Sequence, residues 1–391
     1  MATATPVINL DYAASTPLRP EALAAQAAYD ASELAGVNPN SLHSLGRAAA
    51  VRLEEARREV AASLGARTRA SEVIFTGGGT EANLLALIGI AEGARARDPR
   101  RTRVLVSAIE HDSVLDNIPL LRAAGFTVEK LPVCRSGYVE PAELERRMDA
   151  DVALVSVMLA NNETGVVQPV RELAAIAHAA GALVHTDAIQ GWLHIPADVS
   201  ELGVDALSMA GHKVGGPVGV GALYLKTRTP IRARGFGGGQ ERGLRPGTQD
   251  LRAIVGLAAA ASALAPRVAQ ERDRLSQLAD GLYHRLCANA RIHASMGSWR
   301  DVERLPGIVS IYVEGWDSEE LILQLDARGF AVSAASACSS GSMDASHVLT
   351  AMGIPRDDAL GSLRISFDDR VDSADLDRFA GTLLELVGAS C

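Results

Sequence analysis

The chain is 391 residues long, which exceeds the size at which a single hydrophobic core usually stops growing, so we expect two lobes. Hydrophobic residues make up 48% of the sequence and charged residues 22%, a composition typical of folded globular proteins that excludes a disordered chain. The net charge of −9 argues against a nucleic-acid partner, because binding to a phosphate backbone depends on clustered Lys and Arg.

The N-terminal residues carry no positive charge before Arg19 and no long apolar run, so the sequence predicts no secretory signal. The most apolar stretch, residues 254–265, is mostly alanine and too short to span a bilayer. We therefore expect a cytoplasmic protein that does not bind membranes.

The cysteines lie far apart in the sequence and form no C-x-x-C pair: Cys134, Cys287, Cys338 and Cys391. A metal site built from these residues is not expected, and a reducing cytoplasm disfavours disulfides. We predict packing roles for Cys134 and Cys287, since a free cysteine packs as a small hydrophobe.

From about residue 50 to 260, strand-like and helix-like segments alternate, which is typical of an open, mostly parallel α/β sheet. The predicted strands of this part are residues 73–75, 104–106, 152–157, 182–184, 206–209 and 221–225, and a helix over 82–95 follows the first. The elements predicted beyond residue 265 are a long polar helix over 268–287, a strand over 308–313, a helix around 319–328 and a strand over 362–367. They indicate a second, smaller α+β lobe that the N-terminal segment joins.

Four polar residues follow predicted strands at the point where each strand ends: His111, Asn162, Asp187 and Lys213. In open α/β sheets, ligands bind in the crevice outside the carboxyl ends of the strands. One such residue alone is equally well explained as a turn residue. Four together predict a single site.

Lys213 and Asp187 together indicate the chemistry of pyridoxal phosphate. A lysine amine forms a Schiff base with the aldehyde of this cofactor, and a carboxylate beside the ring nitrogen keeps that nitrogen protonated, so the ring can accept electrons from the substrate carbon. Taken alone, Lys213 would be interpreted as an ordinary solvated lysine.

Two glycine-rich segments fit a site that binds an anion. The Gly-Gly-Gly-Thr turn at residues 77–80 lies between a strand and a helix, where glycine lets the backbone approach a phosphate and the helix N-terminus offers free N–H groups. The turn matches neither G-x-G-x-x-G nor a P-loop, which argues against nucleotide binding. The second segment, residues 235–247, contains Arg242 and Arg245 and either lines the site or forms a flexible surface loop.

These features belong to motifs that occur in order along the chain, at residues 10–17, 38–43, 76–83, 110–111, 160–165, 185–190, 211–217, 237–248, 336–347 and 363–367. In these motifs the chain resembles the cysteine desulfurases, pyridoxal-phosphate enzymes of the class V aminotransferase group. The resemblance implies fold type I of the pyridoxal-phosphate-dependent transferases, an α/β fold. Its large domain, with a mostly parallel seven-stranded sheet, would span residues 17–262, and residues 1–16 and 263–391 would form a smaller α+β domain.

The resemblance also implies roles for the residues at the strand ends. Lys213 would bind pyridoxal 5'-phosphate covalently, and Asp187 would pair with the ring nitrogen. Gln190 would contact the ring hydroxyl, and His111 would stack on the ring and relay protons.

The residues that would bind the phosphate group are Gly79, Thr80, His212 and, from the other subunit of a homodimer, Thr248. Asn162 would contact the cofactor and, together with Arg364, the carboxylate of the substrate. A guanidinium can hold a carboxylate through two parallel hydrogen bonds, and this geometry is expected for Arg364.

Cys338 would be the nucleophile, and its surroundings support this role independently. Residues 333–342 are small and polar without apolar periodicity, which predicts a mobile, exposed loop. Because the thiolate is the reactive form, a nearby base such as His111 or the bound substrate would activate the cysteine. The implied reaction takes sulfur from L-cysteine and yields L-alanine and a Cys338 persulfide, whose sulfur would pass to an iron–sulfur scaffold or a thiolation enzyme.

Two alternatives remain. A selenocysteine lyase or a related class V lyase or aminotransferase would keep Lys213 and Asp187 but would differ in whether Cys338 is essential. A non-catalytic binding protein on the same fold would have no need for these three residues together.

Two residues depart from the pattern of the family. Ala210 stands where many members have a hydroxyl that helps to bind phosphate, and Ala335 stands where a glycine commonly precedes the catalytic cysteine. The sequence also ends soon after Phe367, without the longer tail with which similar housekeeping members dock a scaffold, so the acceptor stays open.

Overall fold

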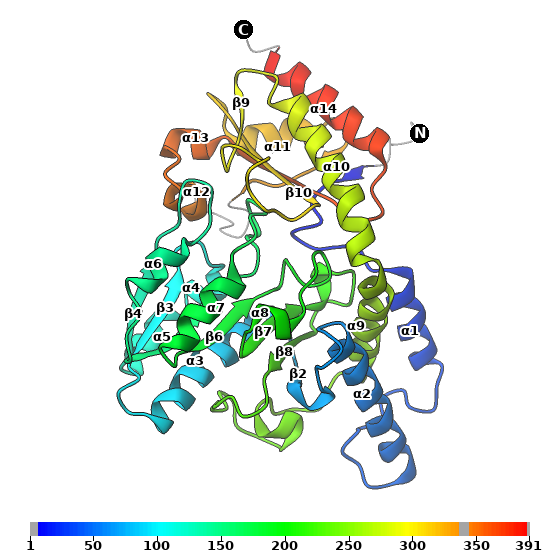
Figure 1. Cartoon of the computed structure of the whole chain (residues 1–391). Helices are drawn as coiled ribbons and strands as arrows, with labels where there is room; N and C mark the ends of the chain where they lie inside the picture. The colour runs from blue at the N-terminus through cyan, green and yellow to red at the C-terminus, as the bar shows by residue number, and fades with distance from the viewer. Residues whose placement is uncertain (1–6, 336–343, 389–391) are drawn as a thin grey trace.

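A seven-stranded sheet forms the centre of the larger lobe in the computed structural model of the chain, which describes residues 7–335 and 344–388 (Figure 1). The strands, in spatial order, are β2 (Val73–Thr76), β8 (Gly221–Leu225), β7 (Ala206–Ala210), β6 (Leu183–Asp187), β5 (Val152–Ser156), β3 (Arg103–Ser107) and β4 (Thr127–Leu131). Only β8 runs antiparallel to its neighbours. The carboxyl ends of the other six strands therefore lie at one edge of the sheet.

Two hydrophobic cores lie on opposite faces of this sheet because side chains alternate along a strand. Val104 and Val106 of β3 belong to one core, and Leu105 between them belongs to the other. The helices of the larger lobe are α1 (Pro20–Asp30), α2 (Ser44–Ala62), α3 (Gly79–Arg97), α4 (Asp112–Leu115), α5 (Ile118–Ala123), α6 (Pro141–Glu145), α7 (Val170–Ala179), α8 (Val199–Leu202) and α9 (Leu251–Leu264). Helix α3 packs on one face, and α2, α7 and α9 pack on the other.

The smaller lobe has its own core around a three-stranded antiparallel sheet. Its strands, in spatial order, are β12 (Ser362–Ser366), β10 (Ile308–Val313) and β9 (Ile292–Ala294). The helices that accompany this sheet are α10 (Val268–Leu286), α11 (Ser318–Asp326), α12 (His347–Ala351), α13 (Arg356–Leu360) and α14 (Ser373–Gly388). The chain start pairs with this lobe, because β1 (Ile8–Asn9) runs parallel to β11 (Phe330–Ala331). The proposed domain boundaries stay a prediction.

The predicted α/β class and the mostly parallel seven-stranded sheet are confirmed. The sequence analysis missed β4, an edge strand whose sequence Thr-Val-Glu-Lys-Leu contains both exposed and buried positions. It also missed β1 and β11, two strands of only two residues each that pair with each other. Such short strands carry no periodicity that a sequence pattern can reveal.

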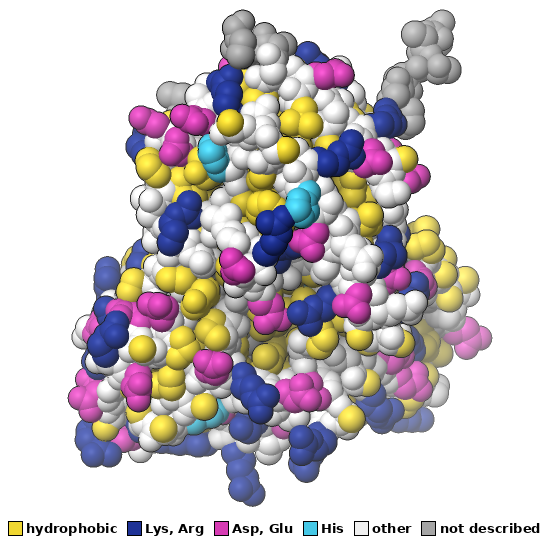
Figure 2. Space-filling model, turned by 45° about the horizontal axis from the view of Figure 1, so that its top comes forward, with side chains coloured by type: hydrophobic (Ala, Val, Ile, Leu, Met, Phe, Trp, Pro, Cys, Tyr) yellow, Lys and Arg dark blue, Asp and Glu magenta, His cyan; other side chains and the backbone are white. Residues whose placement is uncertain are grey.

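The apolar stretch at residues 254–265 is part of a longer helical rod than the sequence predicted. Helix α9 continues through a 3₁₀ turn at Ala265–Arg267 into α10, and the 36 residues from Leu251 to Leu286 are long and apolar enough to cross a membrane by length and composition alone. However, 56% of the most apolar window is buried inside the protein, as in the core helix of a globular domain. On the face shown in Figure 2, basic and acidic side chains are interspersed over both lobes.

Candidate active site

A cavity of about 200 Å³ lies at the carboxyl edge of the parallel strands, between the two lobes. Its walls contain all the predicted cofactor and substrate residues except Thr248 and Cys338; the lining residues are Ala13, Ala14, Gly79, Thr80, His111, Ser113, Met158, Ala160, Asn162, Asp187, Ile189, Gln190, Ala210, His212, Lys213 and Arg364. The strand-end pattern thus predicted the place of the site, although the role of each residue stays a prediction.

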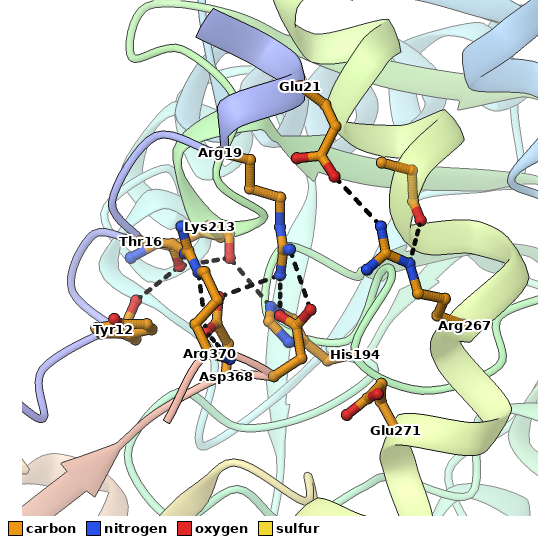
Figure 3. Close-up of polar contacts among 12 residues, drawn as sticks. Tyr12, Thr16, Arg19, Glu21, His194, Lys213, Arg267, Glu271, Asp368 and Arg370 are labelled. Carbon is orange, nitrogen blue, oxygen red and sulfur yellow. Dashed lines mark hydrogen bonds and ion pairs between the residues drawn. The ribbon is translucent and has the colours of Figure 1, made fainter. Parts of the chain in front are cut away.

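Lys213 lies in a 3₁₀ turn, Gly211–Lys213, directly after β7. Its Nζ donates hydrogen bonds to the carbonyls of Ala13 (2.7 Å) and Ala14 (2.9 Å). Its own carbonyl accepts from Thr16 Oγ1 (2.8 Å) and His194 Nε2 (3.0 Å), as Figure 3 shows. Hydrogen bonds to neighbouring segments therefore hold both the side-chain amine and the backbone carbonyl of Lys213.

Asp187 ends β6, and its buried carboxyl group faces the same cavity. Oδ1 accepts the N–H of Ile189 (2.9 Å), and Oδ2 accepts Asn83 Nδ2 (2.6 Å). Burial raises the pKa of Asp187 above its usual range, although these hydrogen bonds and the nearby His111 and Lys213 oppose the shift. A buried carboxyl group of this kind favours a cationic partner.

Asn83 and Ser113 connect Asp187 to His111, and the sequence analysis assigned neither a role. The amide of Asn83 also donates to Ser113 Oγ (2.9 Å), which lies 2.9 Å from His111 Nδ1. The backbone N–H of Ser113 donates to the same ring nitrogen at 3.0 Å. Nδ1 is therefore an acceptor, so the neutral imidazole carries its proton on Nε2. A polar side chain on the buried face of α3 was the available signal for Asn83.

The glycine turn has the shape of an anion cradle. Gly78 has φ of 148° and ψ of −178°, a conformation that side chains strongly disfavour, and Gly79 begins α3. A Cβ on Gly79 would lie 2.2 Å from Ile189 Cδ1, so a larger residue there would have to displace the Ile189 side chain. Thr80 and His212 line the same cavity, and burial lowers the pKa of His212 to about 4, which keeps its ring neutral near pH 7.

No residue of the segment 235–247 lines this cavity within one chain, although lining the site was one of the two interpretations of that segment. It is anchored instead by Glu241, whose buried carboxylate accepts two hydrogen bonds from Arg57 (2.6 and 2.8 Å) and one from the Phe75 N–H (2.9 Å). Glu241 and Arg242 have φ of 46° and 59°, so the backbone is strained where the ion pair holds it. Thr248 follows this segment and is exposed.

Arg364 reaches the cavity from β12 of the smaller lobe and is 2% exposed. Its Nη2 donates to Asp11 Oδ1 (3.0 Å) and its Nη1 to the carbonyl of Asn162 (3.1 Å). Its Nε is buried and finds no hydrogen-bond partner among the described residues. Asp11, which lies in the motif at residues 10–17 and was given no role there, thus pairs with the predicted carboxylate-binding residue.

Cys338 lies outside the described residues, but the residues on both sides of its segment contact Arg364 of the site or residues next to the site in sequence. On one side, Ser333 exchanges backbone hydrogen bonds with Arg364 (2.7 and 3.3 Å). On the other side, Ser346 Oγ donates to Glu163, a buried residue whose pKa burial raises to about 7. Next to it, His347 Nε2 donates to the carbonyl of Glu110 (3.1 Å).

Metal binding has no support within residues 7–335 and 344–388, where no group of three or more His, Cys, Asp or Glu side chains could hold an ion. Cys134 and Cys287 are free and partly buried.

Comparisons with known proteins agree with this geometry. The model of the family "Aminotransferase class-V" matches residues 8–379. The chain belongs to the class-V aminotransferase family. A curated member, the IscS-like cysteine desulfurase of Mycobacterium tuberculosis, is 41% identical over 371 residues, which cover 94% of this chain and 93% of that protein.

Solved structures of this family share the whole fold. A NifS-like protein superimposes with a TM-score of 0.89 at 33% identity and covers 98% of this chain and 100% of its own. A structure described as SspA in complex with cysteine has a TM-score of 0.79 at 30% identity and covers 92% and 98% of the two chains. The resemblance to the cysteine desulfurases that the motifs suggested is therefore confirmed.

Glu110 of this class-V protein is fully buried beside His111. Its burial leads to a specific prediction about how the stability of the protein depends on pH. Its Oε1 accepts the Met158 N–H (2.7 Å), whereas its Oε2 has no partner among the described residues. Burial raises its pKa to about 8, and the Asp187 charge adds to the shift. Between about pH 4.3, the ordinary pKa of a glutamate, and about pH 8, the native state keeps a proton on Glu110 that the unfolded chain has lost.

We therefore expect the free energy of unfolding to fall as the pH rises from about 5 to 8, on the order of a few kcal/mol from this group. The Glu110→Gln variant cannot titrate, so its stability should change less over this range than that of the native protein. Urea unfolding at several pH values measures the difference, with the exposed Glu33→Gln as the matched control. Parallel curves for native protein and Glu110→Gln would contradict the assignment.

Proposed function

We propose that the protein is a pyridoxal-phosphate-dependent cysteine desulfurase. The observation that carries the proposal is one cavity, lined by Lys213, Asp187 and Arg364, in a chain that is similar to cysteine desulfurases over nearly its whole length. The direct test is the release of L-alanine and sulfide from L-cysteine, with and without a reductant.

The residues of the cavity fit the cofactor. Asp187 is a buried carboxyl group that favours a cation, and a protonated ring nitrogen supplies one. Lys213 would bind the cofactor covalently, and Gln190 would lie near the ring hydroxyl. The glycine turn, with Thr80 and His212, would hold the phosphate. When bound, pyridoxal phosphate withdraws electrons from the substrate carbon.

The chain's own groups account for the remaining steps. Arg364, whose Nε lacks a partner among the described residues, and Asn162 would hold the substrate carboxylate. The Lys213 amine would take the α-proton, and His111, with its proton on Nε2, would relay protons within the same cavity.

The Cys338 thiolate would attack the sulfur of the substrate. An S–S bond forms on Cys338 while the C–S bond of L-cysteine breaks, and the carbon gains a proton to give L-alanine. The persulfide keeps the transferred sulfur, so this step needs no external oxidant.

The runner-up functions share most of this site. A selenocysteine lyase or a related aminotransferase would use the same Lys213 and Asp187 but would not depend on Cys338. A non-catalytic binding protein would show no visible absorbance from a bound cofactor. The relative solved with cysteine favours the desulfurase among these.

We further propose that the protein works in the cytoplasm and passes its sulfur to an acceptor protein, either an iron–sulfur scaffold or a thiolation enzyme. The acidic net charge of −9 supports a protein acceptor rather than a nucleic acid.

Replacing Lys213 should abolish turnover and the absorbance of the Lys213-bound cofactor, because no other amine lines the described part of the cavity. The chain has only three lysines, Lys130, Lys213 and Lys226, so borohydride reduction followed by peptide mass spectrometry can locate the link. The cofactor mass should appear on the Lys213 peptide alone. A reducible cofactor link that persists in Lys213→Ala would show that the assignment is wrong.

Cys338→Ser should still bind cofactor and cysteine but release no sulfur, since a hydroxyl is a far poorer nucleophile than a thiolate near neutral pH. Mass spectrometry of the native protein, after cysteine and before any reductant, should show one additional sulfur on the Cys338 peptide. Cys134→Ser is the matched control and should keep full activity. A serine variant at position 338 that makes alanine and sulfide at the native rate would favour the lyase or aminotransferase.

We also propose a homodimer in which Thr248 completes the partner's phosphate site. Thr248 is exposed and absent from the cavity of its own chain. Next to it, Gln249 Oε1 accepts a hydrogen bond from Asn40 (3.2 Å), which lies near the exposed Leu42. Leu42 and Phe236 are 89% and 92% exposed, an apolar exposure that a partner subunit would cover.

Mixed dimers of Lys213→Ala and Thr248→Ala subunits test this arrangement. If Thr248 acts across the interface, each mixed dimer has one site with both residues intact and should bind cofactor there with native affinity. The homodimer of Thr248→Ala should bind more weakly at both sites, because a phosphate hydrogen bond is missing. A fully active monomer in sedimentation, or mixed dimers with no native site, would refute the proposal.

A further inference from the structure

The segment formed by residues 11–19, which we call the N-terminal strap, holds the turn that carries Lys213. The Thr16 N–H donates to the carbonyl of His212 (2.8 Å), and the Arg19 N–H donates to the carbonyl of Gly215 (2.8 Å). Between these two bonds, Thr16 Oγ1 lies 2.8 Å from the carbonyl of Lys213 and 3.1 Å from that of Tyr12, and the shorter distance favours donation of its single proton to Lys213. The strap therefore fixes the backbone before, at and after the lysine.

His194, in the loop after β6, also donates a hydrogen bond to the Lys213 carbonyl. Its Nε2 lies 3.0 Å from the Lys213 oxygen, and a carbonyl can only accept, so this ring nitrogen carries a proton. Burial lowers the pKa of His194, which favours the neutral ring with that single proton. The Lys213 carbonyl thus has two donors, one from the strap and one from the loop after β6.

The charged groups that face His194 belong to an ion cluster between the lobes (Figure 3). Arg19 of the strap donates to Asp368 (3.2 Å) and Asp369 (3.1 Å), which follow β12, and Arg370 also pairs with Asp368 (2.7 Å). Arg19 and Asp368 are almost fully buried. Because β12 also carries Arg364, the cluster ties the predicted substrate-binding strand to the strap that holds Lys213.

We propose that Thr16 and His194 are positioning residues that fix the Lys213 amine by holding the carbonyl of the same residue. The ε-amine lies at the end of a flexible four-carbon chain, so its average place depends on how firmly the backbone is set. Loss of one donor leaves the carbonyl less satisfied and lets the peptide plane turn. Neither residue lies in the wall of the cavity, so neither has to touch the cofactor.

This inference rests on the proposed function, and the experiment measures covalent capture separately from binding. Apoprotein is mixed with pyridoxal phosphate, and the absorbance of the Schiff base on Lys213 is followed over time. Pyridoxamine phosphate, which has no aldehyde and cannot react with a lysine, reports non-covalent binding to the same cavity. A misplaced Lys213 amine should slow the formation of the Schiff base and leave the binding of pyridoxamine phosphate unchanged.

The variants come in matched pairs. His194→Leu and Thr16→Val remove the donor at similar volume, whereas His194→Gln and Thr16→Ser keep an N–H or O–H donor. We expect the first pair to capture the cofactor at least about five-fold more slowly, the net effect of about one hydrogen bond. Affinity for pyridoxamine phosphate should stay within about two-fold of native in all four variants, and the second pair should also keep the native rate of capture.

Three results would overturn the inference: native capture rates in His194→Leu and Thr16→Val, equal losses in the donor-keeping variants, or weaker pyridoxamine phosphate binding in proportion to the slower capture. If His194→Leu does not fold, the nearly isosteric Thr16→Val decides. If the native protein itself forms no Schiff base on Lys213, the proposed function fails rather than this inference.

Discussion

The structure of the site depends on hydrogen-bond partners for the polar side chains that are buried between the two lobes. Arg364 and Asp187 approach one cavity from different lobes, and an unpaired charge in such a place costs several kcal/mol. Asp11 of the N-terminal strap pairs with Arg364, and the carbonyl of Ala13 accepts from both Lys213 (2.7 Å) and Gln190 (2.9 Å). One short segment thus hydrogen-bonds to side chains from both lobes, so the chain start is an integral part of the site.

On the other side of the cavity, a hydrogen-bond path sets the protonation of His111. The path runs from Asp187 through Asn83 and Ser113 to the imidazole Nδ1. Because Asn83 lies in α3 and Ser113 lies in α4, rotation of the ring away from Ser113 would break at least one bond. The path fixes the tautomer without adding a charge, which suits a residue that has to relay protons near a buried carboxyl group.

The position of the site could be predicted from the sequence because it depends on local order. Each parallel strand ends at the same edge, so the residues after β3, β6 and β7 had to meet. Asp11, Asn83 and His194 could not be found in this way. Asp11 pairs with a residue 353 positions away, and no periodicity or spacing connects two such distant residues. The role of Asp11 follows from how the chain start meets β12, and those of Asn83 and His194 follow from side-chain contacts within the larger lobe.

The same limit explains the segment that carries Thr248. The sequence left open whether its glycines line the site or form a surface loop, and only the buried Arg57–Glu241 pair shows that the backbone is anchored while Thr248 stays exposed and outside the cavity of its own chain. Ala210 bears on the phosphate-binding role that we propose for Thr248. Its methyl group lines the cavity beside Gly79, and a methyl group offers no hydrogen bond to an anion. In the proposed homodimer, a rigidly held Thr248 from the partner subunit would carry a larger share of phosphate binding, and retention of the cofactor would then depend on assembly.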